Sequence, residues 1–178
     1  MSRIKRLTSH LLLTVSTLLG AQAHAAPPSV YRTDLKFVDD QGAPRVLGEW
    51  RGRPVVIAMA YGACRSICSS TLRTMEELQA TALRRGVTMD FVVVSIDPVQ
   101  DTPEVWAEYR KVRRHLRSNW TFLSGDKDAT RVLAGFLGVK FWSYDEHVMH
   151  DYKIVRLGPD GAIEAALDWN HRDVERML

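Results

Sequence analysis

The stretch VVIAMAYGACRSICSSTLRTMEEL, residues 55–78, carries the features that decide the fold. Residues 54–61 form a continuous, partly β-branched apolar run, which is typical of a buried central strand. The two cysteines of the chain, Cys64 and Cys68, follow directly. Over residues 69–85 apolar side chains recur at helical spacing and a glycine comes next, which predicts a helix that ends there. The cysteine pair therefore lies at a strand-to-helix junction.

The rest of the chain alternates predicted strands with predicted helices. We expect a hairpin around Asp40-Gln41-Gly42, a strand over 89–96 and a helix over 102–117, with Thr102 as its cap and Pro103 at its first position. A strand over 120–123 and a helix over 126–138 that Gly138 closes should follow. The chain should end with a hairpin over 150–167, which turns at 159–161, and a short helix in the tail. This order indicates an α/β fold in which helices flank a central mixed β-sheet. Because a C-x-x-x-C pair stands at a strand-to-helix junction, we expect a single thioredoxin-like domain with an N-terminal β-hairpin.

The first 25 residues have the three-part pattern of a secretory signal peptide. A basic start, MSRIKR, precedes a short apolar segment, and AHA places small residues where cleavage occurs, after Ala25. The apolar segment has about 10 residues, whereas a membrane-spanning helix needs about 20. We therefore expect residues 1–25 to be removed, residues 26–178 to form the domain, and the product to be exported to the periplasm without a stable membrane anchor.

Removal of the signal peptide changes the charge of the chain. The full sequence has 24 basic and 21 acidic residues, and the signal peptide takes three basic residues with it. A near-neutral mature chain lacks the basic composition of nucleic-acid-binding proteins, so we expect no nucleic-acid partner. One basic run remains, YRKVRRHLR over residues 109–117. It predicts a solvated helix face, with docking to an acidic partner as the alternative.

Cys64 and Cys68 could form a structural staple, a redox couple or a metal clamp. A disulfide persists after export, but a bridge that closes so short a loop stabilises a fold little. If the helix begins near Cys64, the two Cα atoms lie about 6 Å apart on one face. The helix N-terminus and the intervening Arg65 should lower the pKa of both thiols. Thiolates suit disulfide exchange and also bind Cu(I), so both of these uses stay open.

Two thiolates make an incomplete metal site, and an imidazole would be a suitable third ligand. The histidines of the mature chain are His115, His147, His150 and His171. We expect His115, in the basic helix, and His171, in the tail, to be solvated. His147 and His150 lie in a predicted loop that enters a strand, from which a side chain could reach the cysteines. Met149 and Met59 are expected to pack rather than to bind metal.

Three longer segments resemble the SCO/SenC family of copper-binding, thioredoxin-fold proteins that help to assemble cytochrome c oxidase. They are VVVSIDPVQDTPEVWAEY (residues 92–109), NWTFLSGDKDATRVLAGFLGV (119–139) and HDYKIVRLGPDG (150–161). The last segment places a histidine at the family's distance from a Gly-Pro-Asp-Gly turn, which selects His150 over His147. The resemblance implies that Cys64, Cys68 and His150 are copper ligands. Asp97 and Asp101 would either orient His150 or contact a partner, or serve only turn and helix-cap chemistry.

The chain departs from the family pattern beside the cysteines. The family has Pro-Asp after the first cysteine and Pro after the second, and this chain has Arg65, Ser66 and Ser69 in their places. The loss of two prolines removes backbone constraint at the start of the helix. The more positive surroundings favour thiolates but oppose an incoming cation.

Two functions follow from the cysteines and the resemblance. In the first, the protein is a metallochaperone rather than an enzyme, and it delivers copper, as Cu(I) or Cu(II), to the CuA centre of an oxidase subunit. In the second, Cys64 and Cys68 form a redox-active disulfide, and the protein is a thiol–disulfide oxidoreductase that reduces the CuA-site cysteines of that subunit. The expected partners are the CuA-bearing subunit and, in addition, periplasmic copper chaperones or thiol reductases.

Overall fold

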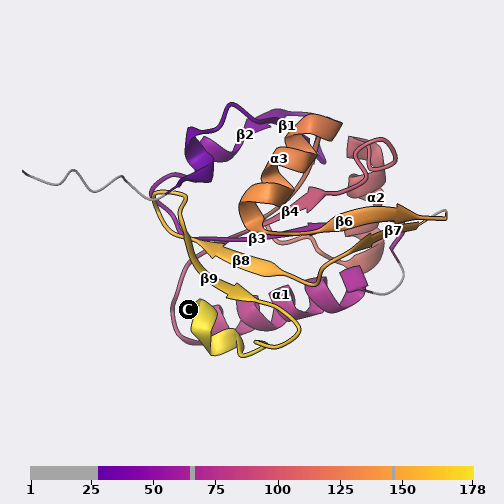
Figure 1. Cartoon of the computed structure of the whole chain (residues 1–178). Coiled ribbons are helices and arrows are strands. Elements are labelled where there is room, and N and C mark those ends of the chain that lie inside the picture. The colour runs from indigo at the N-terminus through magenta and orange to yellow at the C-terminus, as the bar shows by residue number, and fades with distance from the viewer. Residues whose placement is uncertain (1–27, 65–66, 146) are drawn as a thin grey trace, which may run out of the picture.

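The computed structural model of the chain describes residues 28–64, 67–145 and 147–178 (Figure 1). The predicted signal peptide, residues 1–25, lies outside the described residues, as do Arg65 and Ser66. None of the helices in the described part of the chain has the length and apolar character needed to span a membrane.

A seven-stranded mixed sheet forms the centre of the fold. Its strand order is β2-β1-β5-β4-β3-β8-β9. The strands are β1 (Lys36–Asp39), β2 (Pro44–Val46), β3 (Val55–Ala60), β4 (Asp90–Ser95), β5 (Trp120–Gly125), β8 (Ile154–Leu157) and β9 (Ile163–Leu167). The neighbours β3, β4 and β5 run parallel, while β8 is antiparallel to β3 and β1 is antiparallel to β5. The predicted N-terminal hairpin is confirmed as β1 and β2.

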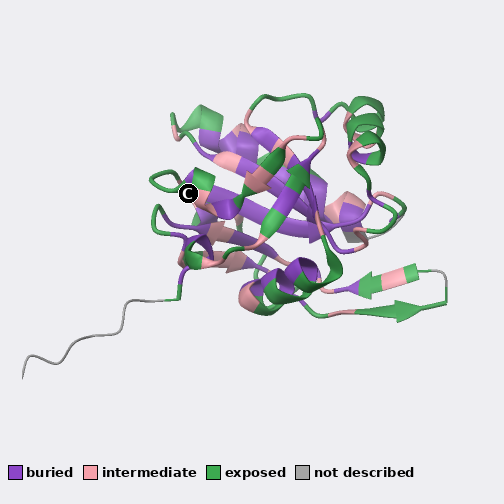
Figure 2. Cartoon of the chain, turned by 90° about the horizontal axis from the view of Figure 1, so that it is seen from above, coloured by how far each residue is buried: buried purple, intermediate pink, exposed green. Residues whose placement is uncertain are grey.

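Helices cover both faces of this sheet. They are α1 (Ile67–Arg84), α2 (Pro103–Arg113) and α3 (Lys127–Leu137), and the short 3-10 helices are η1 (Val30–Arg32), η2 (Leu47–Trp50) and η3 (Val174–Met177). Figure 1 shows α1 and α3 on opposite sides of the sheet. All six residues of β3 are buried, because helices cover the strand from both sides. Figure 2 shows this buried centre in purple, and the predicted thioredoxin-like α/β fold is confirmed.

Side-chain caps explain where α2 and α3 begin, and the cap formed by Thr102 is the predicted one. The side chain of Thr102 accepts a hydrogen bond from the N–H of Val105, and the side chain of Asp126 accepts one from Ala129. At the far end of α3, Gly138 adopts a left-handed φ of 66°, as expected for a residue that ends a helix. Local sequence signals thus set these boundaries.

The prediction that α2 extends to residue 117 is wrong. Arg114 has a φ of 60°, which ends the helix at Arg113, and the N–H of His115 donates to the carbonyl of Arg110. The turn places His115 in the interior, where it is 8% exposed, so the prediction of a solvated His115 is also wrong. Its ring stacks on Trp120 at a centroid distance of 5.3 Å. The basic run is therefore only in part a solvated face.

A two-stranded ribbon, β6 (Phe141–Tyr144) with β7 (His147–His150), replaces the loop that the sequence predicts before β8. Figure 2 shows it extending from the body of the protein, with most of its surface exposed. Because little of the ribbon is buried, its sequence carries no strong apolar alternation, and the pattern failed to reveal it. The ribbon ends at His150, next to the start of β8.

Candidate metal centre

Cys64 lies in the turn that follows β3 and precedes α1. The N–H of Cys64 donates to the carbonyl of Tyr61, and the N–H of Cys68 donates to the Cys64 Sγ atom at 3.3 Å. Since α1 begins at Ile67, the Cys64 sulfur accepts a hydrogen bond from the first turn of the helix, in the manner of an N-cap side chain. No disulfide joins the two cysteines, Cys64 is 7% exposed, and Cys68 is fully buried.

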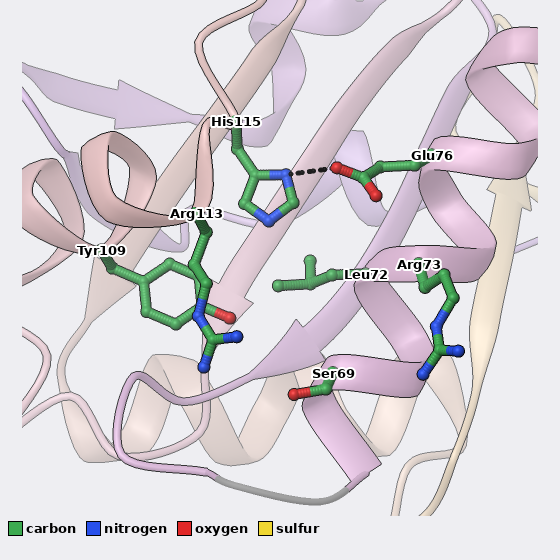
Figure 3. Close-up of a pocket in the computed structure, with 7 residues that line it drawn as sticks. All are labelled: Ser69, Leu72, Arg73, Glu76, Tyr109, Arg113 and His115. Atoms are coloured by element: carbon green, nitrogen blue, oxygen red, sulfur yellow. Dashed lines mark ion pairs between the residues drawn. The ribbon is translucent and has the colours of Figure 1, made fainter.

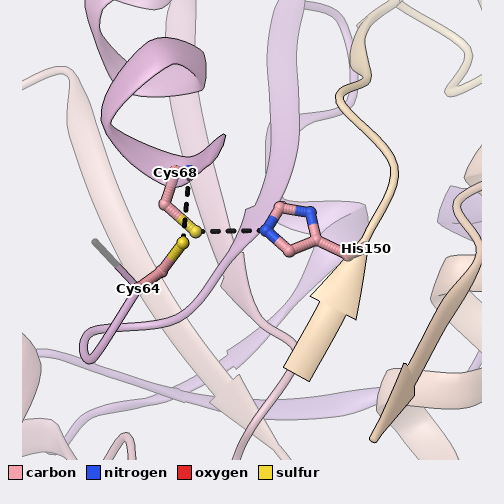
Figure 4. A group of neighbouring side chains, drawn as sticks. All are labelled: Cys64, Cys68 and His150. Carbon is pink, nitrogen blue, oxygen red and sulfur yellow. Dashed lines mark hydrogen bonds between the residues drawn. The ribbon is translucent and has the colours of Figure 1, made fainter. Parts of the chain in front are cut away.

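His150 comes to the cysteines from the end of β7. Its Nε2 atom lies 3.2 Å from the Sγ atom of Cys68, although the two residues are 82 positions apart (Figure 4). The candidate ligand atoms of Cys64, Cys68 and His150 all lie within 4.8 Å of one another. All three residues are buried. Among the described residues, this is the group of acidic, histidine and cysteine side chains that could hold a metal ion.

The backbone fixes the ring orientation and the tautomer of His150. The Nδ1 atom lies 2.9 Å from the carbonyl oxygen of Asp151. A carbonyl oxygen only accepts, so Nδ1 carries the proton and Nε2 turns its lone pair toward the sulfurs. An imidazole held in this way is a typical metal ligand, because the second hydrogen bond orients the ring. The partner is a backbone carbonyl, so no residue type in the sequence signals this orientation.

The other histidines of the described chain do not meet the cysteines. His147 is exposed and pairs with Tyr144 across the ribbon, and it points to the opposite face from His150 because the two are three residues apart on one strand. His171 is exposed beside Asp168, as predicted. Met59 is buried in β3, as predicted for a packing residue, whereas Met149 is 38% exposed, so the packing prediction for Met149 is wrong.

Comparison with known proteins assigns the chain to a family. The SCO1/SenC family model matches residues 23–178, which is most of the sequence. The chain belongs to the SCO1/SenC family. A candidate copper-binding protein of Stutzerimonas stutzeri is 28% identical over 160 residues, which cover 86% of this chain and 74% of the relative.

Solved structures show the same fold as this SCO1/SenC chain. ScoI of Arabidopsis thaliana with copper bound superposes with a TM-score of 0.70 at 20% identity, covering 80% of this chain and 90% of that chain. BsSco, described as a member of the Sco family of cytochrome c oxidase assembly proteins, superposes with a TM-score of 0.69 at 19% identity, covering 81% and 86%. Likeness at these identities confirms the fold of this SCO1/SenC protein.

The environment of Cys68 in the SCO1/SenC chain disfavours a free thiolate. Its hydrogen bond with the Cys64 side chain raises the pKa of the Cys68 thiol, and burial raises it further. The prediction that the helix N-terminus lowers the pKa of both thiols is therefore wrong for Cys68. The shared proton and the lost hydration outweigh the favourable field of the helix. A cation that binds both sulfurs would replace the proton and release it.

Asp101 braces the loop that carries Cys64. Its Oδ1 atom accepts a hydrogen bond from the N–H of Gly62 at 2.9 Å, and its Oδ2 atom accepts one from the Ser95 hydroxyl at 2.5 Å. Burial raises the pKa of Asp101 to about 6. The hydrogen bonds of the Asp101 side chain thus reach the cysteine loop and the end of β4, and none of them reaches His150.

Asp97 serves the turn between β4 and α2. Its N–H donates to the Ser95 hydroxyl oxygen at 2.9 Å, and its carbonyl accepts from the N–H groups of Gln100 and Asp101. Of the three roles predicted for Asp97 and Asp101, turn chemistry is the one that the hydrogen bonds of Asp97 express. Sequence patterns did not identify Ser95, whose hydroxyl links Asp97 and Asp101. A serine at the end of a strand carries no specific sequence signal.

Proposed function

We propose that this chain is an exported copper-binding protein that delivers copper to the CuA centre of cytochrome c oxidase. The observation that carries the proposal is the convergence of two thiol sulfurs and one imidazole nitrogen within 4.8 Å of one another. We assign Cys64, Cys68 and His150 as the copper ligands. Copper is the cargo of the protein and not a catalytic cofactor.

The donor set suits copper in its reduced state. Two thiolates and one imidazole are soft or borderline ligands, and thiolates select Cu(I) over hard cations. The Nε2 atom of His150 faces the sulfurs, and the hydrogen bond at Nδ1 orients the ring for metal binding. The copper-bound Arabidopsis relative and the Stutzerimonas relative support the same assignment.

The partner is proposed from the family. BsSco, a relative of the same fold, is described as a member of a family of cytochrome c oxidase assembly proteins. Cys64 is the more exposed of the two sulfur ligands, at 7% against 0% for Cys68. An acceptor thiolate of the oxidase subunit would therefore reach the metal from the Cys64 side, and Cys68 and His150 would release it last.

A thiol–disulfide oxidoreductase is the second candidate, and the same difference in exposure favours it. The Cys64 thiolate would attack a disulfide of the oxidase subunit and form a mixed disulfide, releasing one partner thiol. The Cys68 thiolate would then attack Cys64 Sγ and release the second partner thiol. Two electrons pass to the partner, and Cys64 and Cys68 end as a disulfide. This reaction does not use His150.

A chelator competition separates the two candidates. The reduced protein should retain Cu(I) against a colorimetric Cu(I) chelator. His150→Ala should weaken retention by at least about tenfold, because loss of an outer-shell partner of a ligand alone costs about tenfold to a hundredfold. His147→Ala is the matched control and should leave retention unchanged. The rate of reduction of a model disulfide should be the same in both variants.

The outcomes of this competition are distinct. If the reduced wild-type protein loses Cu(I) to the chelator as readily as His150→Ala does, copper delivery is rejected. If it retains Cu(I) but fails to reduce a disulfide peptide, the oxidoreductase is rejected.

We also propose export with cleavage after Ala25, on the signal-peptide pattern of the first 25 residues. The mass of the protein recovered from the periplasm of an expressing bacterium tests this proposal. A recovered species that retains residues 1–25 would contradict it.

A further inference from the structure

A cavity of about 340 Å³ lies between α1 and the end of α2, beside the metal centre. Figure 3 shows one wall built by α1 and the other by α2 and the turn that follows it. The first wall contributes Ser69, Arg73 and Glu76, the second contributes Tyr109, Arg113 and His115, and Leu72 lies between them. The two arginines thus approach one cavity from opposite sides.

Both guanidinium groups are available to a ligand. Among the described residues, neither Arg73 nor Arg113 has a carboxylate within ion-pair distance. Arg113 lies over the Tyr109 ring, with its central carbon 5.7 Å from the ring centroid. Stacking of this kind holds a guanidinium in place and leaves its N–H edge free to donate.

The one acidic group on the wall is already engaged. Glu76 Oε1 lies 3.1 Å from Nδ1 of His115. Burial lowers the pKa of His115, so at neutral pH the ring is uncharged and its Nδ1–H donates to the carboxylate. Among the described residues, the cavity lining therefore carries two positive charges against one negative charge, and the carboxylate of Glu76 would repel a dianion such as phosphate more than a monoanion.

Two hydroxyl groups complete the set of donors. Burial raises the pKa of Tyr109 to about 12, so the phenol stays protonated and can donate. Ser69 directly follows Cys68 in α1, at a position where the family has proline. An anion in the cavity would consequently lie next to the cysteines.

We propose that this cavity is a carboxylate receptor, which binds an aspartate or glutamate side chain of the protein that exchanges copper with the centre. Arginine pairs recognise planar carboxylates through paired hydrogen bonds, and the excess of one positive charge matches a single carboxylate. The receptor gives Arg113, within the basic run of residues 109–117, a docking role. The identity of the partner rests on the proposed copper delivery, while binding of the carboxylate does not.

A peptide titration of the reduced, copper-free protein tests the receptor. The probe is a blocked triglutamate peptide, the comparison is a blocked triglutamine peptide, and backbone amide NMR shifts report binding. The triglutamate peptide should shift amides of residues 69–76 and 109–115. The double variant Arg73→Gln/Arg113→Gln should weaken binding at least about tenfold, because each lost charge-assisted hydrogen bond accounts for about that factor.

The control variant removes the same number of charges elsewhere. Lys111→Gln/Arg131→Gln alters two highly exposed residues, with side chains 76% and 70% exposed, outside the cavity lining. It should weaken binding less than about twofold at an ionic strength where surface charges are screened. Equal weakening by both double variants, or equal binding of triglutamine, overturns the receptor.

Two further measurements identify the source of the carboxylate and isolate this proposal from the copper site. Citrate or inorganic phosphate that binds more tightly than the peptide would overturn docking of an acidic side chain, because the cavity would then be a site for free anions. Retention of Cu(I) by Arg73→Gln/Arg113→Gln should equal that of the wild type. If the wild type holds no Cu(I), the proposed function fails, and the peptide titration still decides the receptor.

Discussion

At the scale of single residues, the centre depends on backbone groups as much as on side chains. The carbonyl of Asp151 sets the tautomer of His150, and the N–H of Cys68 bonds the sulfur of Cys64. The carboxylate of Asp101 holds the N–H of Gly62 in the same loop. Two of the three ligands are thus held in place by local hydrogen bonds.

Cys64 has two roles: its sulfur accepts a hydrogen bond at the start of α1, and it is a proposed copper ligand. A serine at this position can keep the first role but not the second. We expect Cys64→Ser to lower Cu(I) retention as strongly as Cys64→Ala, because both variants lose the thiolate. The serine oxygen can still accept the N–H of Cys68, so Cys64→Ala should be less stable than Cys64→Ser by about 1 kcal/mol, as for a lost helix cap. Urea unfolding measures the difference, and equal stabilities would contradict the capping role of the sulfur.

Asp101 should make stability depend on pH in the acid range. Its pKa of about 6 in the folded chain exceeds the ordinary aspartate pKa of 3.8. Between these values the folded state binds more protons than the unfolded state, so this group's contribution to stability is present below pH 4 and is lost as pH rises through 6. Relative to Asp101→Asn, the wild type should lose up to about 3 kcal/mol between pH 4 and pH 7.

Chemical unfolding of both proteins across this range measures that difference. The Asn amide can accept from Gly62 and donate to Ser95, so the variant keeps the geometry without the titration. A wild-type stability that rises relative to the variant with increasing pH would contradict a raised pKa.

At the scale of elements, the sequence predicts what local chemistry determines. Thr102 and Gly138 mark helix ends because a side-chain acceptor and a left-handed glycine act on neighbouring backbone groups. The sequence fails where tertiary contacts decide. The left-handed conformation of Arg114 turns the chain inward, and His115 then stacks on the buried ring of Trp120. The β6–β7 ribbon forms without the burial that produces a readable pattern.

The turn between β8 and β9 provides a test of backbone conformation at this scale. Gly161 has a φ of 81°, and a Cβ atom there would lie 2.5 Å from the ring of Tyr31. Gly161→Ala should therefore cost about 2–4 kcal/mol, from the left-handed conformation and from overpacking together. Gly42→Ala is the control, because Gly42 has a φ of 79° with open space around it, and it should cost about 1–2 kcal/mol.

The urea concentrations at the unfolding midpoints of the two glycine variants measure these losses, provided that the dependence of the unfolding free energy on urea concentration is the same in both. Equal losses would show that the Tyr31 contact relaxes without cost, which would contradict the packing part of the prediction.

At the scale of the whole molecule, strand order explains why distant residues meet. Strand β8 lies antiparallel beside β3, with Ala58 opposite Ile154, so the segment after β3 and the segment before β8 reach the same end of the sheet. Cys64 and Cys68 follow β3, and His150 precedes β8. The sequence predicted both strands but not their pairing, and only the likeness to a known family selected His150. Periodicity carries no information on which strands become neighbours.

This topology predicts that copper stabilises the entire fold. A metal bound by Cys64, Cys68 and His150 links two segments 82 residues apart, and the unfolded chain cannot hold that link. Cu(I) buffered at a thousandfold excess over its dissociation constant should add about 4 kcal/mol to the free energy of unfolding. For a domain of this size that corresponds to a rise in Tm of about 10 °C.

Thermal unfolding of the reduced protein, with and without buffered Cu(I), measures this rise. His150→Ala should show a much smaller rise at the same copper activity, and His147→Ala the full rise, because only His150 supplies the link from the ribbon end. Addition of excess chelator should return the wild type to its copper-free Tm. If copper stabilised His150→Ala as strongly as the wild type, Cys64 and Cys68 would hold the metal without the histidine. The pairing of β3 with β8 would then bring His150 close to a copper ion that it does not bind.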